Sequence, residues 1–513
     1  MNDMTGIFKK CILVFLGVWI LTMMSCSPKN YKTKSRSAGS GELQDKAAIA
    51  KAFGELTRDD DPEKVYDVFN RFCQAYFGAK TDTLYYAYGN NVSIVENSRW
   101  QYISERSAAI AWKTNLPAKT YIEYGQDKKY GYQTAPQERY FFIHLHYLTK
   151  LQPGRRYYYR IVSLDETGRK TASEQRSFIT PKLENVIYLP GNQGKPPYVL
   201  DKANTTYLVT ENIIADRSAF DIRAENITLD LGGNTVTHAS QLIHNLDYED
   251  HANAGVGIRS INVRPLSGLK IYNGRIKQGD AKNNLDYIAG DNMLDPDPER
   301  EKRLEKNASR GFSNIEISNV GNVEIAGVSV EYHLPQTWGM RFDKAFGSYD
   351  IHHNVYLDKG VQMFNRHGDG GARSMGFRSL NSADSNLYQG DNAFKISHNL
   401  VKRTRQNALN VAKQIYDNEI YVDSWSVNSF AIHPAMENAE VHDNKIFLTG
   451  YYGCGILWSL KNMRVKRNFI HMEGVRTMIK KPLLGRRLIE TWGEQDVLAG
   501  MRVTNYGKGG TER

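Results

Sequence analysis

Four side chains in the C-terminal half of the sequence have the chemistry of a cation paired with a base: Arg341, Lys344, Lys413 and His433. Removal of the proton at C5 of a uronate sugar needs a cation that neutralises the sugar carboxylate and a base with a lowered pKa. We expect Arg341 to stabilise the negative charge, and one of the other three side chains to act as the base. Candidate substrate-binding residues accompany them: Trp338, Asp343, Gln362, Arg366, His367 and Asn410. This set predicts cleavage of an acidic polysaccharide by β-elimination.

Two other functions remain open for the same part of the chain. A glycoside hydrolase needs two carboxyl groups, about 5 Å apart or roughly 6.5–9.5 Å apart according to its stereochemistry. Asp343 and Asp369 are the nearest candidates for such a pair. The third function is binding of a glycan without cleavage, as in an adhesive surface protein. If the protein is an enzyme, alanine at Arg341 or His433 should abolish turnover and leave folding intact.

A repeat in the sequence predicts the elements that position these residues. Short apolar runs are interrupted by asparagines whose intervals are 45, 19, 26 and 24 residues: Asn354, Asn399, Asn418, Asn444 and Asn468. One such unit cannot bury its apolar face alone, so we expect the units to stack. Asparagine suits a tight turn with left-handed backbone geometry, and stacked amides can hydrogen-bond along the column.

This pattern, with segments 226–236 and 269–276, resembles the right-handed parallel β-helix of the pectate-lyase-like superfamily over residues 182–513. The resemblance implies coils of three strands, with a substrate-binding face on the first strand of each coil. It does not fix the activity. The galacturonase-like pattern of clustered Asp with Gly-His-Gly and Arg-Ile-Lys is incomplete, because Arg275-Ile-Lys277 is present but no Gly-His-Gly occurs. A lyase is therefore favoured over a hydrolase.

Reading forward from each asparagine predicts which first-strand side chains share one outward row. Successive coils stack about 4.8 Å apart, so eight coils make a wall on the order of 35–40 Å long, which matches an extended polymer. We expect a positively charged trough, flanked by loops 239–255, 278–310 and 366–392. The predicted row is Asp221, Arg259, Ser313, Arg341, Gln362, Asn410, His433 and Leu457.

A period of two begins near residue 97 and predicts a second β domain. Its segment Leu151-Gln-Pro-Gly-Arg-Arg-Tyr157 resembles the corner of a fibronectin type III domain, in which the tyrosine hydroxyl bonds to the backbone. The resemblance covers residues 96–181 and implies a β-sandwich, usually a spacer. Residues 27–95 are expected to be a tether and a short helical segment. The predicted fold class is therefore all-β, a right-handed parallel β-helix preceded by this sandwich.

The first 26 residues have the features of an export signal. Lys9 and Lys10 precede an apolar run that is too short for a comfortable membrane span. The run ends at Met23-Met24-Ser25-Cys26, which resembles a bacterial lipobox and implies acylation of Cys26 after cleavage. We expect an exported protein that is lipid-anchored to the bacterial cell envelope, in the periplasm or at the cell surface.

Charge and cysteine content limit the classes of partner and cofactor that we expect. The 66 Lys and Arg exceed the 56 Asp and Glu, a net charge of +10 that suits an anionic polysaccharide. No long basic run follows the N-terminus, so nucleic acid is not expected. No cofactor is expected either, although the oxygen-rich segment 291–299 is a weak candidate for Ca²⁺ because it lacks the spacing of a calcium loop. Cys73 and Cys454 give no metal or disulfide pattern.

Overall fold

The computed structural model describes residues 91–240, 255–279, 313–333, 337–360, 373–377, 393–424, 430–436, 438–450, 454–458, 464–472 and 501–503, together with Ala48. Every regular element in these ranges beyond Ala48 is a β-strand. Among the residues described, no helix has the length and hydropathy to cross a membrane. The predicted helical segment, apart from Ala48, and the predicted lipidation site Cys26 lie outside the described residues.

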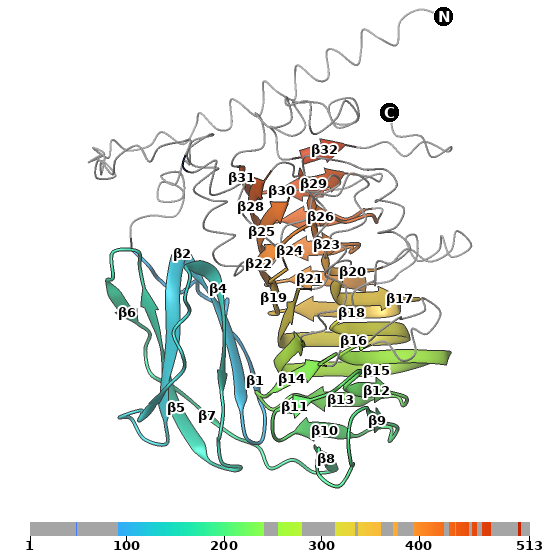
Figure 1. Ribbon diagram of the computed structural model, residues 1–513. Coiled ribbons are helices and arrows are strands. Elements are labelled where there is room, and N and C mark those ends of the chain that lie inside the picture. The colour runs from blue at the N-terminus through green and yellow to red at the C-terminus, as the bar shows by residue number, and fades with distance from the viewer. Residues whose placement is uncertain are drawn as a thin grey trace, which may run out of the picture. The chain divides into compact units, whose positions relative to one another are not determined.

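The first described domain is an antiparallel β-sandwich of seven strands (Figure 1). The first half of β2 pairs with β1 and β4, and its second half pairs with β3 and β5, so one long strand contributes to both layers. Strand β5 also pairs with β6 and β7. Trp112 and Tyr159, which are 0% and 1% exposed, belong to the core between the layers. The strands are β1 (Trp100–Ile103), β2 (Ala108–Gly125), β3 (Tyr132–Gln133), β4 (Phe141–Leu148), β5 (Arg156–Leu164), β6 (Lys170–Ala172) and β7 (Arg176–Ile179).

The hydrogen bond expected of the predicted tyrosine corner is present. The hydroxyl of Tyr157 accepts a hydrogen bond from the backbone N–H of Gln152 at 2.9 Å, and the tyrosine side chain is buried. Gly154 provides the turn between these two residues with a φ of 68°, a left-handed conformation that glycine adopts without steric cost. The sequence signal of this corner therefore predicts its geometry correctly.

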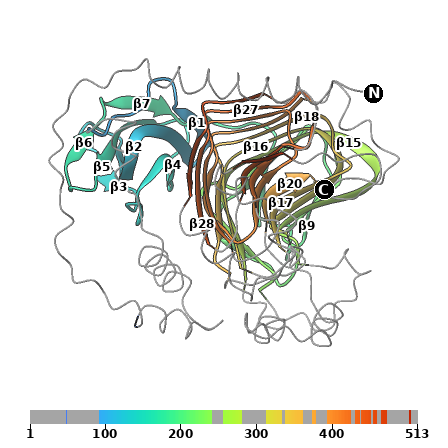
Figure 2. The same cartoon turned by 90° about the horizontal axis from the view of Figure 1, so that it is seen from above.

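The described residues between 186 and 503 form a right-handed parallel β-helix whose coils each contribute three strands (Figures 1 and 2). The first-strand column contains β9 (Tyr198–Leu200), β12 (Phe220–Ile222), the start of β15 (Ile258–Gln278), the start of β16 (Ile315–Tyr332), β17 (Trp338–Asp343), β20 (Arg373–Phe377), β23 (Asn407–Asn410), β26 (Phe430–His433), β29 (Cys454–Trp458) and β32 (Met501–Val503). Strands β15 and β16 run without interruption through all three columns, since each pairs with separate strands along its length.

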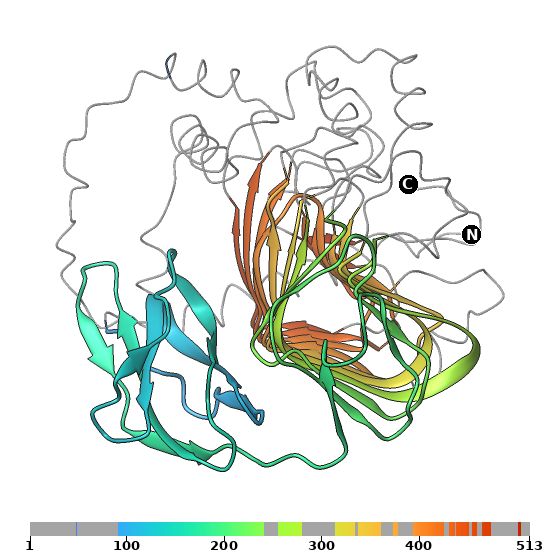
Figure 3. The same cartoon turned by 60° about the horizontal axis from the view of Figure 1, so that its bottom comes forward.

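The other two columns complete the coils, and Figure 3 views them toward the N-terminal end, where the first coils are green. The second column contains β8 (Val186–Leu189), β10 (Thr206–Val209), β13 (Ile227–Asp230), the middle of β15 and β16, β18 (Phe346–His352), β21 (Ala393–Ser397), β24 (Gln414–Tyr416), β27 (Glu440–His442) and β30 (Arg464–Lys466). The third column contains β11 (Ile213–Ile214), β14 (Thr235–His238), the ends of β15 and β16, β19 (Val355–Asp358), β22 (Leu400–Thr404), β25 (Glu419–Ser424), β28 (Lys445–Gly450) and β31 (Phe469–Met472). Inward apolar side chains from all three columns form one continuous core.

The repeated asparagines form a hydrogen-bonded ladder between the second and third columns. The side-chain oxygen of Asn418 accepts the backbone and side-chain N–H of Asn399, both at 3.0 Å, and the oxygen of Asn444 is bonded in the same way by Asn418. This confirms the predicted stacking of amides. The predicted left-handed backbone is wrong at the ladder positions, because the preceding residues adopt it, with φ of 56° at both His398 and Asp417. The asparagines themselves are buried and satisfy backbone groups inside the turn.

The sandwich packs directly on this turn edge of the β-helix, so it is not a separate spacer. The carboxylate of Glu419, which is 0% exposed, accepts the backbone N–H groups of Phe142 and Ile143 from β4. The hydroxyl of Tyr147 donates to backbone carbonyls of two coils, at 2.9 and 3.0 Å. Trp100 stacks on His353 with 5.2 Å between ring centroids. Buried polar contacts of this kind fix the orientation of one domain on the other.

Candidate functional site

The hydrogen-bonded register of the first-strand column tests the predicted outward row directly. Asp221 pairs with Arg259, and Arg341, Asn410 and His433 follow it in the same row. Their neighbours on the strands, among them Met340 and Leu409, are fully buried in the core, so the row faces away from it. Ile432 pairs with Ile456, which places Leu457 next along the row. The predicted register is confirmed at these six positions, and the outward direction is confirmed at the first five.

Two members of the predicted row are wrong. Glu316, rather than Ser313, lies between Arg259 and Arg341, because the first strand of that coil begins at Ile315. Gly376 of β20 pairs with both Arg341 and Asn410, so it occupies the position that was predicted for Gln362. The alternation of Ile315 and Ile317 with polar residues was the signal that could have located Glu316.

Charges in the row alternate in sign, which corrects the predicted positive trough. The guanidinium of Arg341 lies 3.5 Å from the carboxylate of Glu316 and 2.8 Å from that of Asp343. One coil pair further toward the N-terminus, Asp221 lies 3.4 Å from Arg259. The side chains of these residues are only 8–17% exposed, so their mutual attraction is screened less than at an open surface. The two arginines are therefore largely neutralised by neighbouring carboxylates.

Arg341 brings two carboxyl groups together in a way that the sequence did not reveal. Because Glu316 and Asp343 both bond one planar guanidinium, their bonded oxygens lie no farther apart than the upper end of the range for inverting glycosidases, about 9.5 Å. One oxygen of Asp343, Oδ1, is buried without a hydrogen-bond partner in the described part of the chain. This oxygen has no exposed surface among the described residues, so the carboxylate is open to solvent only through the rest of its side chain.

The ring of Trp338 reaches the same face from the start of β17, three residues before Arg341. An ideal Cβ built on Gly376 would approach the Trp338 ring to 2.4 Å and the Cβ of Asn410 to 2.8 Å. Glycine at 376 thus leaves the space into which the indole ring projects. Asn410 is 7% exposed, and its side-chain oxygen is buried without a partner among the described residues. An indole face suits the apolar side of a sugar ring.

Two of the three predicted bases, Lys344 and Lys413, lie at one corner of the coils, and the third, His433, lies in the outward row. Lys344 is exposed directly after β17 and has a φ of 49°, and half-buried Lys413 lies in the corresponding turn after β23. His433 ends β26 and makes an edge contact with Phe430 at 5.0 Å between ring centroids. These side chains belong to different coils, so they are spread along the face instead of converging on Arg341. The predicted substrate-binding residues Gln362, Arg366 and His367 lie outside the described residues, as does Asp369.

Two buried ion pairs at the turn between the third and first columns were missed by the sequence reasoning. Arg405, 2% exposed, lies 2.8 Å from Asp358, and Arg403 lies 3.0 Å from Asp423. Arg403 also donates to the carbonyls of Asp358 and Gly360. Each arginine thus ties its turn to neighbouring coils. These pairs fix the chain as it enters β23, the strand that carries Asn410.

No group of three or more His, Cys, Asp and Glu side chains within the described ranges is arranged to hold a metal ion. His352 and His353 do make contact, with 2.8 Å between their Nδ1 atoms, and His353 stacks on His398 at 4.7 Å. Trp100 of the sandwich covers these rings. They therefore contribute to the domain interface. The oxygen-rich segment 291–299 lies outside the described residues.

Comparison with known proteins finds similarity only among solved structures. No protein-family model matches the sequence, and no curated protein matches it. The family 28 exopolygalacturonase of Yersinia enterocolitica is 10% identical, with a TM-score of 0.31 over 74% of this chain and 86% of that one. Pectate lyase PelI of Erwinia chrysanthemi is 11% identical, with a TM-score of 0.20 over 71% and 80%. Pectate lyase Pel3 of Pectobacterium carotovorum is 11% identical, with a TM-score of 0.19 over 73% and 86%. At these identities and TM-scores, the similarity gives no information about the chemistry of this chain.

Proposed function

We propose that the protein binds an acidic polysaccharide along the outward first-strand face of the β-helix and cleaves it by hydrolysis. The observation that carries this proposal is the pair of carboxylates, Glu316 and Asp343, that bond the single guanidinium of Arg341. Hydrolysis of a glycosidic bond needs two carboxyl groups on opposite sides of the scissile bond, one as acid and one as base or nucleophile. Arg341 holds the two side chains in fixed positions.

An acidic substrate is supported by the basic residues at the corner of the same face. Lys344 is exposed and forms no ion pair with another residue of the described ranges. The chain as a whole carries a net charge of +10. A polymer lying along the row would place its carboxylates toward the lysine side and its ring faces on Trp338. The row repeats every coil, which fits the repeat of an extended chain better than a small ligand.

β-Elimination is the second candidate, because Lys344, Lys413 and His433 provide both cations and candidate bases. A lyase needs a cation for the uronate carboxylate and a base, and these side chains supply both without using the neutralised arginines. Hydrolysis is preferred because the carboxylates that it requires lie together, whereas the bases for elimination belong to different coils.

The location of the protein is part of the same proposal. Cleavage of the export signal before Cys26 and acylation of that cysteine would attach the β-helix to the bacterial envelope by more than one chain, as stable anchoring requires. The two-layer pairing of β2 and the corner at Tyr157 support a fibronectin type III-like identity for the sandwich. Metabolic labelling with a radioactive or clickable fatty acid tests the anchor, and a Cys26→Ser variant should lose the label.

The products distinguish the candidate activities. Purified protein is incubated with polygalacturonate and alginate, and with neutral polymers as controls. New reducing ends without alkene absorbance indicate hydrolysis, whereas both signals together indicate β-elimination. Binding without either signal would replace cleavage by a glycan-binding function. If the protein neither binds nor shortens any acidic polymer and does shorten a neutral one, the proposed substrate class is wrong.

A further inference from the structure

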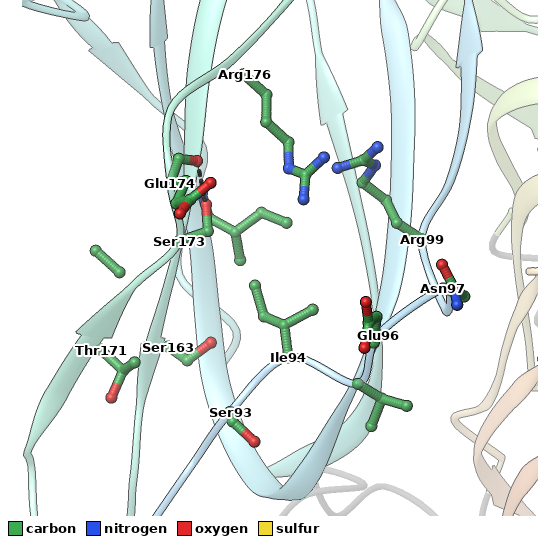
Figure 4. A pocket seen from close by; sticks show the side chains of 13 residues that line it. Ser93, Ile94, Glu96, Asn97, Arg99, Ser163, Thr171, Ser173, Glu174 and Arg176 are labelled. Atoms are coloured by element: carbon green, nitrogen blue, oxygen red, sulfur yellow. Dashed lines mark hydrogen bonds between the residues drawn. The ribbon is translucent and has the colours of Figure 1, made fainter.

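A cavity of the right size for a small ligand opens in the sandwich, away from the first-strand face. Its volume is about 580 Å³, which lies within the roughly 300–1,000 Å³ of typical small-molecule sites. Figure 4 shows it between segment 91–99 on one side and strands β5 and β6 with the following residues 173–176 on the other.

Both walls of this cavity are held by hydrogen bonds to the sandwich. The backbone N–H of Val95 bonds to the carbonyl of Lys113 at 2.9 Å, and that of Ser93 bonds to the side chain of Asn115 at 2.7 Å. On the opposite wall, the backbone N–H of Ser173 bonds to the carbonyl of Ile161 at 2.8 Å. The cavity is therefore formed before any ligand enters, which reduces the entropic cost of binding.

Two arginines meet at one end of the cavity. Figure 4 shows the guanidinium groups of Arg99 and Arg176 turned toward each other. Neither forms an ion pair with a carboxylate of the described ranges. Two like charges facing across a concave surface repel each other, and an anion between them removes this repulsion while accepting hydrogen bonds from both.

The rest of the lining restricts the kind of anion. Ile94, which is half-buried, provides an apolar patch, and the exposed side chain of Thr171 belongs to the opposite wall. Carboxylates are present as well, because Glu96 and Glu174 also line the cavity. A highly charged ligand such as a polyphosphate would be repelled by these glutamates. A sugar with one carboxylate satisfies the arginines, offers hydroxyl protons to the glutamates and rests its apolar side on Ile94.

We propose that Arg99 and Arg176 bind the carboxylate of one acidic sugar residue in this cavity, which makes the sandwich a second glycan-binding site. The choice of an acidic sugar rests on the proposed function, but the site itself does not depend on cleavage by the β-helix. Its place on the docked sandwich would hold a polymer close to the solenoid surface during successive rounds of cleavage.

Hydrogen–deuterium exchange with mass spectrometry distinguishes this site from the first-strand face. The intact protein is mixed with trigalacturonate, with its methyl ester, or with inorganic sulfate. We expect trigalacturonate to protect peptides covering 91–99 and 170–176, and the methyl ester to protect them much less. Protection of these peptides by sulfate alone to the same degree would reduce the site to a simple anion site and overturn the assignment to a sugar.

Affinity measurements complete the test. The double variant Arg99→Ala/Arg176→Ala should bind trigalacturonate at this site at least tenfold more weakly, because two charge-assisted contacts are lost. The matched control, Lys128→Ala/Lys129→Ala, removes the same charge from an exposed turn of the sandwich and should bind as the wild type does. Unchanged protection of 91–99 in the arginine variant contradicts the proposal. If polymer cleavage fails but this protection persists, the proposed activity is wrong and the sandwich site stands.

Discussion

Arg341 is the register partner of Glu316 in the adjacent coil, and 3.5 Å separates the guanidinium from the carboxylate. The same guanidinium bonds Asp343 on its own strand at 2.8 Å. The parallel stacking of coils thus creates a three-residue unit from positions 25 residues apart in sequence. Because one arginine orients both acids, the unit behaves as a single site, and substitution of any member should affect the other two.

The first prediction concerns the two carboxylates. Glu316→Gln and Asp343→Asn each keep the shape of the side chain but remove its ability to exchange a proton or attack the sugar. We expect each variant to lower the rate of reducing-end release by roughly 10²–10⁴-fold, the usual contribution of a general acid or base. Rates measured at saturating polymer give this effect directly.

Glu331→Gln is the matched control for that experiment. Glu331 lies in the third column, where its carboxylate lies 3.1 Å from the ammonium group of Lys359. The substitution therefore removes one carboxylate from a different face of the same solenoid. It should retain nearly the full rate. Retention of activity by both Glu316→Gln and Asp343→Asn would rule out the hydrolytic pair and move the catalytic assignment to the lysines and His433.

The sequence predicts the row well where a coil has a regular length and less well where a loop separates its strands. Asn410 and His433 follow closely spaced asparagine turns, so aligning the inward apolar residues is enough to place them. Gln362 was predicted from the nearest apolar run after Asp358, whereas the next first strand begins only at Arg373. Loop length depends on tertiary packing and has no periodic signal. The charge of the row was mispredicted because the first strand of one coil was placed three residues too early, so that Ser313 took the position of Glu316.

The second prediction concerns the asparagine ladder. In Asn418→Ala the backbone N–H of Asn399 and the carbonyls of Ile396 and Tyr416 lose their side-chain partner. Because these groups are buried, we expect the free energy of unfolding to fall by roughly 2–4 kcal/mol. Urea unfolding followed by circular dichroism measures it.

Gln414→Ala provides the comparison for Asn418→Ala, because Gln414 is exposed on the neighbouring strand β24. Its unfolding free energy should lie within about 0.5 kcal/mol of the wild type. Equal stabilities of the two variants would mean that water or a shifted backbone replaces the amide, and the ladder would then have no energetic role.

The third prediction follows from the histidines at the domain interface. Burial lowers the pKa of His398 to about 4 and that of His353 to about 2, so both rings are neutral in the folded protein. A base with a lowered pKa in the folded state contributes stability above its ordinary value near 6.5, and that stability is lost as the pH falls toward the folded pKa. We therefore expect the melting temperature to decline between pH 6.5 and 4.

His398→Asn removes one of these titrations and keeps a residue that tolerates the φ of 56° at this position. The variant should start from a lower melting temperature, because a ring contact is lost, but should fall less steeply over the same pH range. Differential scanning fluorimetry from pH 4 to 8 compares the slopes. Parallel curves for variant and wild type would show that His398 does not report on the acid sensitivity of the interface.

The fourth prediction uses the space above Gly376. A methyl group there would lie 2.4 Å from the Trp338 ring, so Gly376→Ala must displace the indole from the first-strand face. Gly376 is not among the residues with positive φ, so the backbone accepts alanine, and the change acts through the ring and through the Cβ of Asn410, 2.8 Å away. If Trp338 supports a sugar ring, Gly376→Ala should raise KM several-fold with a smaller effect on kcat, and Trp338→Ala should do the same. Overpacking costs about 1–3 kcal/mol in stability, so thermal unfolding is recorded alongside to establish that the variant is folded under assay conditions. Wild-type KM values in both folded variants would place the sugar elsewhere on the solenoid, because the ring could then be moved or removed without any loss of substrate contact.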